Sequence, residues 1–282
     1  MKKILVLFSL LFILPVFAQD HFSGITTSKR IGIINIGMNP SELANLSSKF
    51  EIQTLAASIN VSNNKVGFKD IINGDNLQNK IFKGDGPVNF NVDAEFYGPG
   101  VATKLLGWGF AISSKGHIKA NIIDVDPNLG DAFSNSVLNS IGSSSIISNN
   151  YNQRVNTTSW GEIGFSVAYQ LFENENSSLN GGLTLKLLFP GSYANIGTGN
   201  FNGTVSTSIL GNAELTNANA NLNIAYTGDF ANSFTNTGDY TRSVFGNLNG
   251  MATDIGFDYQ LKSSGGGYKL KIGAAIKNMG SM

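Results

Sequence analysis

The 282-residue chain contains 33 Gly and no Cys, and its 19 basic residues equal its 19 acidic residues in number. Without Cys, neither a disulfide scaffold nor a lipid-modified cysteine is available. The charge balance gives no indication of a nucleic-acid partner. Charged residues make up only 13% of the chain and aromatic residues 10%, which disfavours a disordered polar chain and favours an apolar surface diluted by polar residues.

The first residues have the pattern of a secretory signal. Two lysines precede an apolar run over 4–17, and Ala18 is a small residue of the kind that a signal peptidase requires. We expect 1–18 to be a signal peptide cleaved before Gln19. A membrane anchor is the alternative, but a spanning helix needs about 20 apolar residues. The remainder, 19–282, is expected to form a single domain.

The next pattern along the chain indicates a short helix. In the segment NPSELANLSSKF (39–50), Pro40 suits the first helical position and Glu42 suits the first turn. No run of 18 apolar residues follows the signal. A mature membrane protein of this sequence would therefore cross the bilayer as a closed set of strands, since unpaired backbone groups find no partner in lipid.

Segments with strand character recur along the rest of the chain. The best of them have 9 to 13 residues, closer to transmembrane strands of about 9–11 residues than to the 5–6 typical of soluble sheets. The expected strands are 50–61, 88–97, 101–112, 117–125, 161–172, 179–189, 201–209, 220–228, 250–261 and 268–278. Residues 62–86 have no clear pattern, and 127–150 are expected to form a long loop carrying a short helix.

Alternation is clearest in GEIGFSVAYQLFENENSSLNGGLTLKLLF (161–189). Apolar side chains take every second position there, which forms one face of a strand but would scatter around a helix. They are Ile163, Phe165, Val167, Tyr169, Leu171, Leu183, Leu185 and Leu187. The segment predicts a hairpin of two-faced strands, and the last two expected strands repeat the pattern around a flexible Gly-rich turn.

The opposite face of these strands carries small and charged residues. The charged ones are Glu162, Lys186, Asp254 and Asp258. In a transmembrane barrel this face would line a polar lumen, whereas in a soluble β-sandwich it would face water. Aromatic residues near the expected strand ends favour the barrel because they suit interfacial girdles. They are Trp160, Tyr169, Phe172, Tyr259 and Tyr268.

The connections support the strand at 201–209. An up-and-down barrel has short turns on one rim and long loops on the other. With that strand included, the short turns 173–178, 210–212 and 262–267 share one rim, and the long segments 190–199 and 228–249 share the other. The predicted fold class is an all-β, antiparallel up-and-down transmembrane β-barrel.

Few residues suit catalysis or metal binding. The two histidines, His21 and His117, lie in no metal-binding or triad pattern. Asp124, Asp126 and Asn128 resemble the start of a calcium loop, but the Gly and the bidentate Glu of such a loop are missing, so a plain turn is favoured. We expect no enzymatic activity, no metal and no cofactor.

Several segments, taken in order, resemble a known family. They are IGIINIGMNPSEL (31–43), VDAEFYGPGVATKLLGWGFAI (92–112), SWGEIGFSVAYQLF (159–172), LNGGLTLKLLFPG (179–191), GMATDIGFDYQL (250–261) and LKIGAAIKNMGSM (270–282). Their order resembles a family of outer-membrane β-barrel proteins of Bacteroidetes, a domain of unknown function. That family is similar to long-chain fatty-acid transporter barrels and to barrel components of type IX secretion. The resemblance implies an outer-membrane location, with membrane lipid and the barrel-assembly machinery as partners.

The resemblance also implies a plug. In the transporter relatives an Asn-Pro-Ala segment lies in a hatch within the lumen; Asn39 and Pro40 match it, and Ser41 replaces Ala. We therefore expect 31–49 to form a lumenal hatch. Because the NMG strand of such barrels is normally followed by more strands, the chain is expected to be C-terminally incomplete.

The function implied by the resemblance is passive uptake of a small hydrophobic ligand, or an envelope or secretion role. The alternative is a secreted or surface β-sandwich that acts in adhesion or in another interaction. A sandwich would be soluble without detergent, and its strands would shorten to about 5–6 residues.

Overall fold

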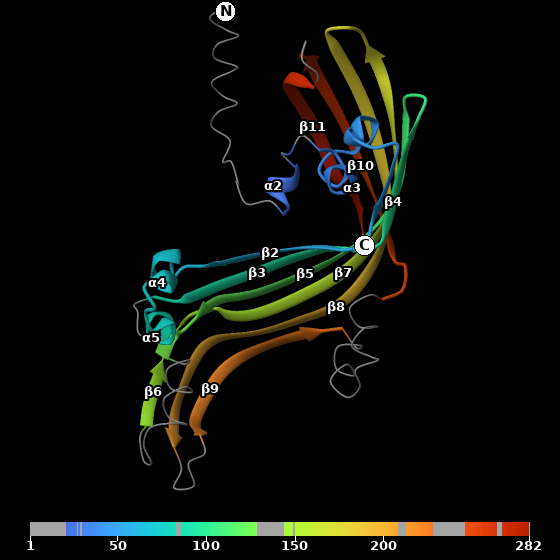
Figure 1. Ribbon diagram of the computed structural model, residues 1–282. Helices are drawn as coiled ribbons and strands as arrows, with labels where there is room; N and C mark the ends of the chain where they lie inside the picture. Colours follow the sequence, from blue (N-terminus) through green and yellow to red (C-terminus); the bar gives the residue numbers. More distant parts are fainter. Residues whose placement is uncertain are drawn as a thin grey trace, which may run out of the picture.

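The computed structural model describes residues 21–26, 28, 30–82, 86–128, 144–148, 150–207, 213–227, 246–263 and 267–281. The eleven strands in these ranges form one antiparallel sheet (Figure 1). The all-β, antiparallel up-and-down class is therefore confirmed. The described sheet is open: β1 and β11 lie at the two ends of its strand order. The predicted signal peptide, 1–18, lies outside the described residues.

The strands vary from four to 31 residues in length. They are β1 (Phe50–Gln53), β2 (Ala56–Asn63), β3 (Val88–Tyr97), β4 (Gly100–Leu105), β5 (Trp108–Val125), β6 (Ser144–Ser148), β7 (Gln153–Glu173), β8 (Ser177–Thr207), β9 (Ala213–Tyr226), β10 (Gly250–Lys262) and β11 (Tyr268–Ser281). The main order is β1-β4-β5-β7-β8-β10-β11; β2 pairs with β3, β3 with β5, and both β6 and β9 with β8.

The long strands β5, β7 and β8 run through two halves of the sheet, which meet at an angle (Figure 1). The proximal half contains β1, β4, β10, β11 and the parts of the long strands that pair with them. The distal half contains β2, β3, β6, β9 and the remaining parts. On β5 the boundary falls between Ile112, the last partner of β4, and Lys115, the first partner of β3.

Small residues and irregular pairing accompany the bend between the halves. Gly116 of β5 lies opposite Gly161 of β7, and the pairing of β7 with β8 shifts register between Thr158 and Trp160, which lies opposite Pro190. Glycine within a strand permits a tight bend, and a bulge increases the local twist. These features of β5, β7 and β8 lie next to one another across the sheet, at the position of the bend.

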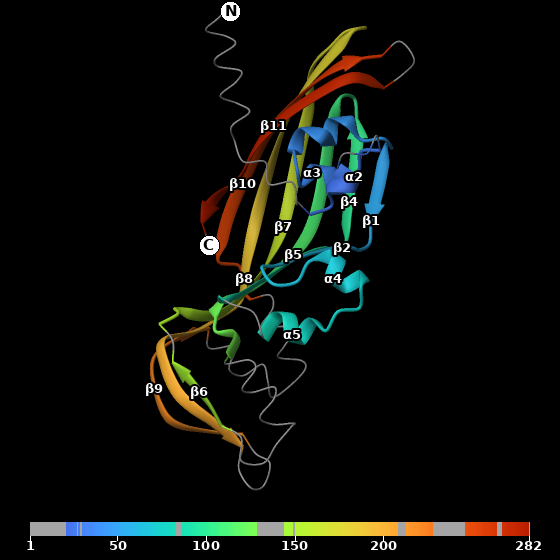
Figure 2. The ribbon, with the colours of Figure 1, turned by 90° about the vertical axis from the view of Figure 1, so that its left-hand side faces the viewer.

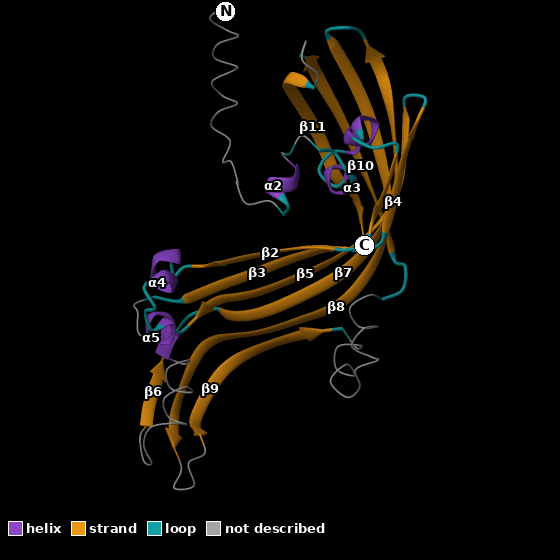
Figure 3. Ribbon diagram, in the orientation of Figure 1, coloured by secondary structure: helices purple, strands orange, loops and turns teal. Residues whose placement is uncertain are grey.

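The described helices are short and cover only part of the sheet. They are α2 (Ser23–Thr26), α3 (Ile33–Ile36), the 3₁₀ helix η1 (Pro40–Asn45), α4 (Phe68–Ile72) and α5 (Leu77–Phe82). α3 and η1 lie against the proximal half, α2 lies beside α3, and α4 and α5 lie in the connection between β2 and β3 (Figures 2 and 3). None of the described helices combines the length and apolar character needed to cross a bilayer.

Two predicted strands in the N-terminal group are wrong. The expected strand 101–112 is a hairpin, because Leu106 and Gly107 both have positive φ, 51° and 80°, and turn β4 back along β5. Two consecutive positive φ values are typical of a type I′ turn. Leucine is an unusual residue for such a turn, so this turn lacks the Asn-Gly or Asp-Gly pattern from which the hairpin could be predicted. The other is 50–61, which is interrupted at Thr54 and Leu55 between β1 and β2.

The outcome at β8 is mixed. Strand character at 201–207 is confirmed, but this segment continues β8, so the predicted long loop at 190–199 is wrong. Pairing with β7 and β9 holds the chain extended there. Within the expected loop 127–150, Ser144–Ser148 form the short strand β6. The predicted turn at 210–212 lies outside the described residues.

The two faces of the proximal half have opposite character. The inner face, defined as the face that η1 covers, includes buried Ala111, Asp254 and Asp258. The outer face carries the alternating apolar residues, among them exposed Phe110, Phe165, Leu185 and Phe257. The predicted alternation is thus present, and its apolar side is the uncovered one.

Candidate functional site

The four predicted charged residues of the polar face all lie buried on the inner face of the proximal half. Glu162 and Lys186 are each 6% exposed, and Asp254 and Asp258 are each 1% exposed. Lys186 Nζ lies 2.7 Å from Asp254 Oδ2 and 3.8 Å from Glu162 Oε2. Asp258 is not part of this group and contacts η1 instead. The structure therefore separates the predicted residues into two sites.

Residues 31–46, called the N-terminal segment here, cover the inner face. Pro40 is the first residue of η1, as expected, and the Asn39 side chain caps this helix by accepting a hydrogen bond from the Ser41 backbone N–H at 3.1 Å. Asn39 Nδ2 also donates to the Phe257 carbonyl oxygen at 3.0 Å. The predicted hatch motif thus both starts the helix and attaches it to β10.

A row of small residues lets this segment approach the sheet. Gly109, Ala168, Gly182, Gly256 and Ala275 lie side by side on five neighbouring strands. A Cβ on Gly182 would overlap the Pro40 backbone, and one on Gly256 would overlap the Asn39 side chain. The larger apolar side chains come from the N-terminal segment, which packs Ile33, Ile36, Leu43, Ala44 and Leu46 against alanines of the sheet.

Buried polar contacts hold η1 to the strands. The Asp258 carboxylate accepts hydrogen bonds from Asn45 Nδ2 at 3.0 and 3.1 Å and from Asn180 Nδ2 at 3.0 Å. Glu42 forms an ion pair with Lys271 of β11. Burial raises the pKa of the Glu42 carboxyl above its usual value, against the opposing effect of Lys271. η1 is therefore attached to β8, β10 and β11.

A continuous row of ion pairs crosses the inner face beside the N-terminal segment. We call it the ion-pair row; each of β3, β5, β7, β8 and β10 contributes one residue. Successive pairs are Glu95–Lys115 at 3.3 Å, Lys115–Glu162 at 3.7 Å, Glu162–Lys186 at 3.8 Å and Lys186–Asp254 at 2.7 Å. Burying these charges is tolerable only because each has an opposite charge beside it.

His117 lies against the ion-pair row. Its Nδ1 is 3.7 Å from Glu95 Oε2, its Nε2 is 3.8 Å from Glu162 Oε2, and its ring stacks on Trp160 at 4.5 Å. Among the described residues, no group of His, Cys, Asp and Glu side chains is arranged to hold a metal ion. Asp126 accepts a hydrogen bond from the Asn128 backbone N–H at 2.8 Å, as in the plain turn favoured for that sequence.

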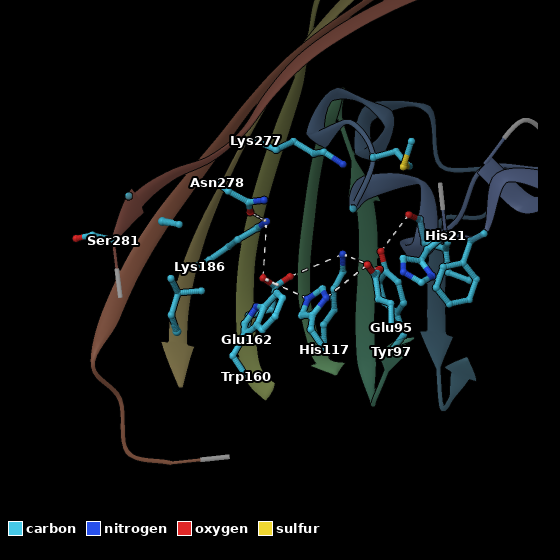
Figure 4. A pocket seen from close by; sticks show the side chains of 18 residues that line it. His21, Glu95, Tyr97, His117, Trp160, Glu162, Lys186, Lys277, Asn278 and Ser281 are labelled. Carbon is cyan, nitrogen blue, oxygen red and sulfur yellow. Dashed lines mark hydrogen bonds and ion pairs between the residues drawn. The ribbon is translucent and has the colours of Figure 1, made fainter. Parts of the chain in front are cut away.

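A cavity of about 310 Å³ lies between the N-terminal segment and the ion-pair row (Figure 4). Phe22, Ile34 and Met38 line it from the N-terminal side, and Trp160 and Leu188 line it from the sheet. Glu95, Lys115, Glu162 and Lys186 of the ion-pair row also reach it, together with Lys277 and Asn278 of β11. The lining thus combines an apolar side with charged groups, a composition suited to a small amphipathic molecule.

The sheet and most of this site fall within a single family match. Residues 42–282 match a family described as "Family of unknown function (DUF5723)". The chain belongs to this family. No curated protein and no solved structure was found to match it. The DUF5723 match begins inside η1, at Glu42, and includes the ion-pair row, Asp258 and the whole described sheet.

Sequence reasoning missed two of the five residues of the ion-pair row in this DUF5723 chain and misplaced one aromatic residue. Sequence reasoning did not predict Glu95 and Lys115, although charges two positions apart in SKGHIKA (114–120) and VDAEF (92–96) are a signal for them. Trp160 was predicted near a strand end, but it lies in the middle of β7 and lines the cavity. β7 begins at Gln153 rather than at the predicted residue 161, which places Trp160 inside the strand.

Proposed function

We propose that this chain forms the wall and plug of an outer-membrane β-barrel that takes up small hydrophobic molecules by passive diffusion. One observation carries the proposal. The sheet is apolar on its exposed outer face and charged on its buried inner face, the reverse of a soluble protein and the arrangement of a barrel in lipid.

The outer face supports contact with lipid. Neighbouring strands place large apolar side chains side by side there: Phe110 lies opposite Val167, which lies opposite Leu183, which lies opposite Ile255. Phe165 is 43% exposed and Phe257 51% exposed. Soluble monomers rarely expose contiguous apolar patches of more than a few hundred Å², whereas lipid would cover such a face.

The β-sandwich alternative receives less support. A sandwich packs the apolar faces of two sheets against each other. All described strands belong to one sheet, and its apolar face is not covered by any of them. In a sandwich, the charged inner face would have to be exposed to solvent, yet Asp254 and Asp258 are buried on that face.

The plug supports gated passage rather than an open pore. The N-terminal segment fills the inner face of the proximal half, so a solute crosses only if the segment shifts or if the solute leaves sideways through the wall. Such diffusion needs no cofactor and no bond chemistry. A closed barrel requires that the open edges of the sheet become paired, and we propose that this occurs during insertion by the barrel-assembly machinery.

Fractionation and electrophoresis test the location and the closure. Cells expressing the chain are separated into soluble, inner-membrane and outer-membrane fractions, and outer-membrane material is run in detergent with and without boiling. We expect outer-membrane residence and a heat-dependent mobility shift. A water-soluble product that runs identically under both conditions would contradict the barrel.

Transport is tested separately. A strain lacking the protein is compared with a complemented strain for uptake of a panel of small hydrophobic solutes. Slower uptake of at least one solute, restored by the chain, is expected. Equal uptake of every solute in both strains would remove the transport role and leave only a structural or secretion role in the envelope.

A further inference from the structure

We propose that the cavity beside the ion-pair row binds a small monocarboxylate with a compact apolar body, and that Lys277 holds the carboxylate. This inference deepens the proposed function by naming the class of solute that is taken up, and only the uptake of that solute rests on the proposed function. The binding site rests on the cavity alone.

Lys277 supplies a positive charge that no carboxylate of the described residues neutralises. Of the three lysines that line the cavity, Lys115 and Lys186 are buried and each contacts two acids of the ion-pair row. Lys277 is exposed and has no acidic partner among the described residues. Figure 4 shows its side chain extending over the cavity with no interaction drawn to it. An unpaired ammonium at the mouth of a cavity is a ready anchor for an anion.

The backbone of β11 directs Lys277 toward the cavity. Thr253 lies opposite Met279 and Ile255 lies opposite Ile276, so two residues of β11, Lys277 and Asn278, face the single residue Asp254. Such a bulge re-aims side chains, and bulges occur often beside functional sites. Both residues line the cavity, whereas regular alternation would place one of them on the outer face.

Asn278 holds this bulge in place. Its φ is 59°, a left-handed conformation that asparagine tolerates better than most residues. Its backbone N–H donates to Asp254 Oδ1 at 2.7 Å, and its Oδ1 accepts from Lys186 Nζ at 2.8 Å. Asn278 is therefore a positioning residue that connects the anchor on β11 to the ion-pair row.

The surrounding charges limit the ligand to one negative charge. Glu95 and Glu162 also line the cavity, and both are already paired with lysines. The lining holds three lysines and two carboxylates, a net charge of +1, which balances one negative charge on a ligand but not the second charge of a phosphate monoester. A cation would meet Lys277 at the mouth. A carboxylate satisfies Lys277 with the least repulsion.

The walls and the volume define the rest of the ligand. Phe22 packs edge-on against Tyr97 at 5.3 Å, and Trp160 is fixed by its stacking on His117. These rigid aromatic side chains form apolar surface opposite the charges. A volume of about 310 Å³ lies at the lower end of the range for small-molecule sites, so it suits a single ring or a short branched chain.

The chain supplies its own reporter for a binding test. It contains two tryptophans: Trp160 lines the cavity, and Trp108 is exposed beside Tyr169. In a Trp108→Phe background, Trp160 is the sole tryptophan. The full chain in detergent micelles is titrated with benzoate, with the neutral amide benzamide and with the dianion phenyl phosphate, and Trp160 fluorescence is recorded.

Two lysine substitutions on β11 separate a specific anchor from a general loss of charge. Lys277→Gln removes the proposed anchor. Lys269→Gln removes an exposed lysine of the same strand that does not line the cavity. We expect saturable binding of benzoate that Lys277→Gln weakens at least fivefold and Lys269→Gln changes less than twofold. Benzamide binding should respond equally little to both, and phenyl phosphate should bind more weakly than benzoate.

Equal benzoate affinity in the two lysine variants, or no saturable change with benzoate in the Trp108→Phe protein, would overturn the inference. The same samples are run boiled and unboiled. A heat-shifted protein without benzoate binding contradicts the inference and leaves the barrel proposal standing. An unshifted, soluble protein that still binds benzoate through Lys277 contradicts the barrel and leaves the ligand site standing.

Discussion

Single residues decide how closely the N-terminal segment approaches the sheet. The inner face presents Gly109, Gly182 and Gly256 where the backbone and side chains of the segment lie. On the same face, alternate positions carry buried charge, as at Lys186 and Asp254. Small residues thus provide the contact surface for η1, while charged residues beside them provide specific attachment.

Replacing Gly182 by Ala should loosen this attachment. A Cβ at this position overlaps the Pro40 and Ser41 backbones, and overpacking of this kind costs about 1–3 kcal/mol. Gly199→Ala, on the same strand, is the matched control because no atom lies within 4 Å of its added Cβ. Amide hydrogen exchange of residues 31–46 measures the effect. Faster exchange is expected in Gly182→Ala alone, and equal exchange in the two variants would contradict the close approach.

Glu42 should make the attachment depend on pH. Burial raises its pKa in the docked segment above the ordinary value of 4.5, so the docked state binds the proton more tightly than the released state does. Docking is then strongest below pH 4.5 and weakens as the pH rises from 4.5 through the raised pKa. Exchange of 31–46 should accelerate over that window.

Glu42→Gln is the control for this pH dependence. The amide cannot lose a proton, so the variant should show a flatter dependence over the same window after correction for intrinsic exchange. The difference between the two proteins isolates Glu42 from Asp258 and from the other acids of the inner face. If both proteins show the same dependence, Glu42 is not the group that titrates on docking.

Helices and strands have the predicted bounds where the sequence signal lies within a single segment. Strand β3 has the predicted bounds, β10 and β11 are predicted within three residues, and η1 begins at Pro40 as expected. Alternation and helix-start signals are local, so one segment is enough to recognise them. The segments 190–199 and 144–148 are extended because they pair with distant strands, and no local pattern reveals that pairing.

The contacts within the candidate site also depend on pairing between distant strands, which no local pattern reveals. Glu162, Lys186, Asp254 and Asp258 were predicted to share a face from alternation alone. That Lys186 contacts two of them and not the third depends on register between strands, and the same applies to Glu95, Lys115 and Lys277. The bulge at Asn278 is visible only once β10 and β11 are aligned.

The turn between β4 and β5 offers a test of local turn chemistry. Leu106 is 89% exposed and has φ of 51°, followed by Gly107 with φ of 80°. Asparagine is favoured at the first of these positions in a type I′ turn, whereas leucine is strained there. Leu106→Asn should therefore stabilise the protein by about 1 kcal/mol, measured by denaturant unfolding, because the left-handed conformation costs an ordinary residue roughly 1–2 kcal/mol. Gly107→Ala should destabilise it, because alanine is strained at positive φ.

At the scale of the whole molecule, the long strands β5, β7 and β8 are longer than a bilayer is thick. The 31 residues of β8 span about 100 Å at roughly 3.3 Å per residue, against an apolar band of about 25 Å in a barrel. Only part of each long strand can then lie in lipid. The proximal half is the better candidate, because its outer face carries the denser set of exposed apolar residues and its inner face carries the plug.

Single cysteines can locate the membrane on the sheet, because the chain has no cysteine of its own. Leu185→Cys and Ile196→Cys lie on β8 in the proximal and distal halves, at positions 37% and 56% exposed. In outer-membrane vesicles, we expect Leu185→Cys to react with a lipid-soluble maleimide and not with a charged, water-soluble one. Ile196→Cys should react with both. If both cysteines react equally with the charged reagent, lipid does not cover the proximal half and the barrel proposal loses its main support. If only Ile196→Cys is protected from the charged reagent, the distal half is the one that crosses the membrane.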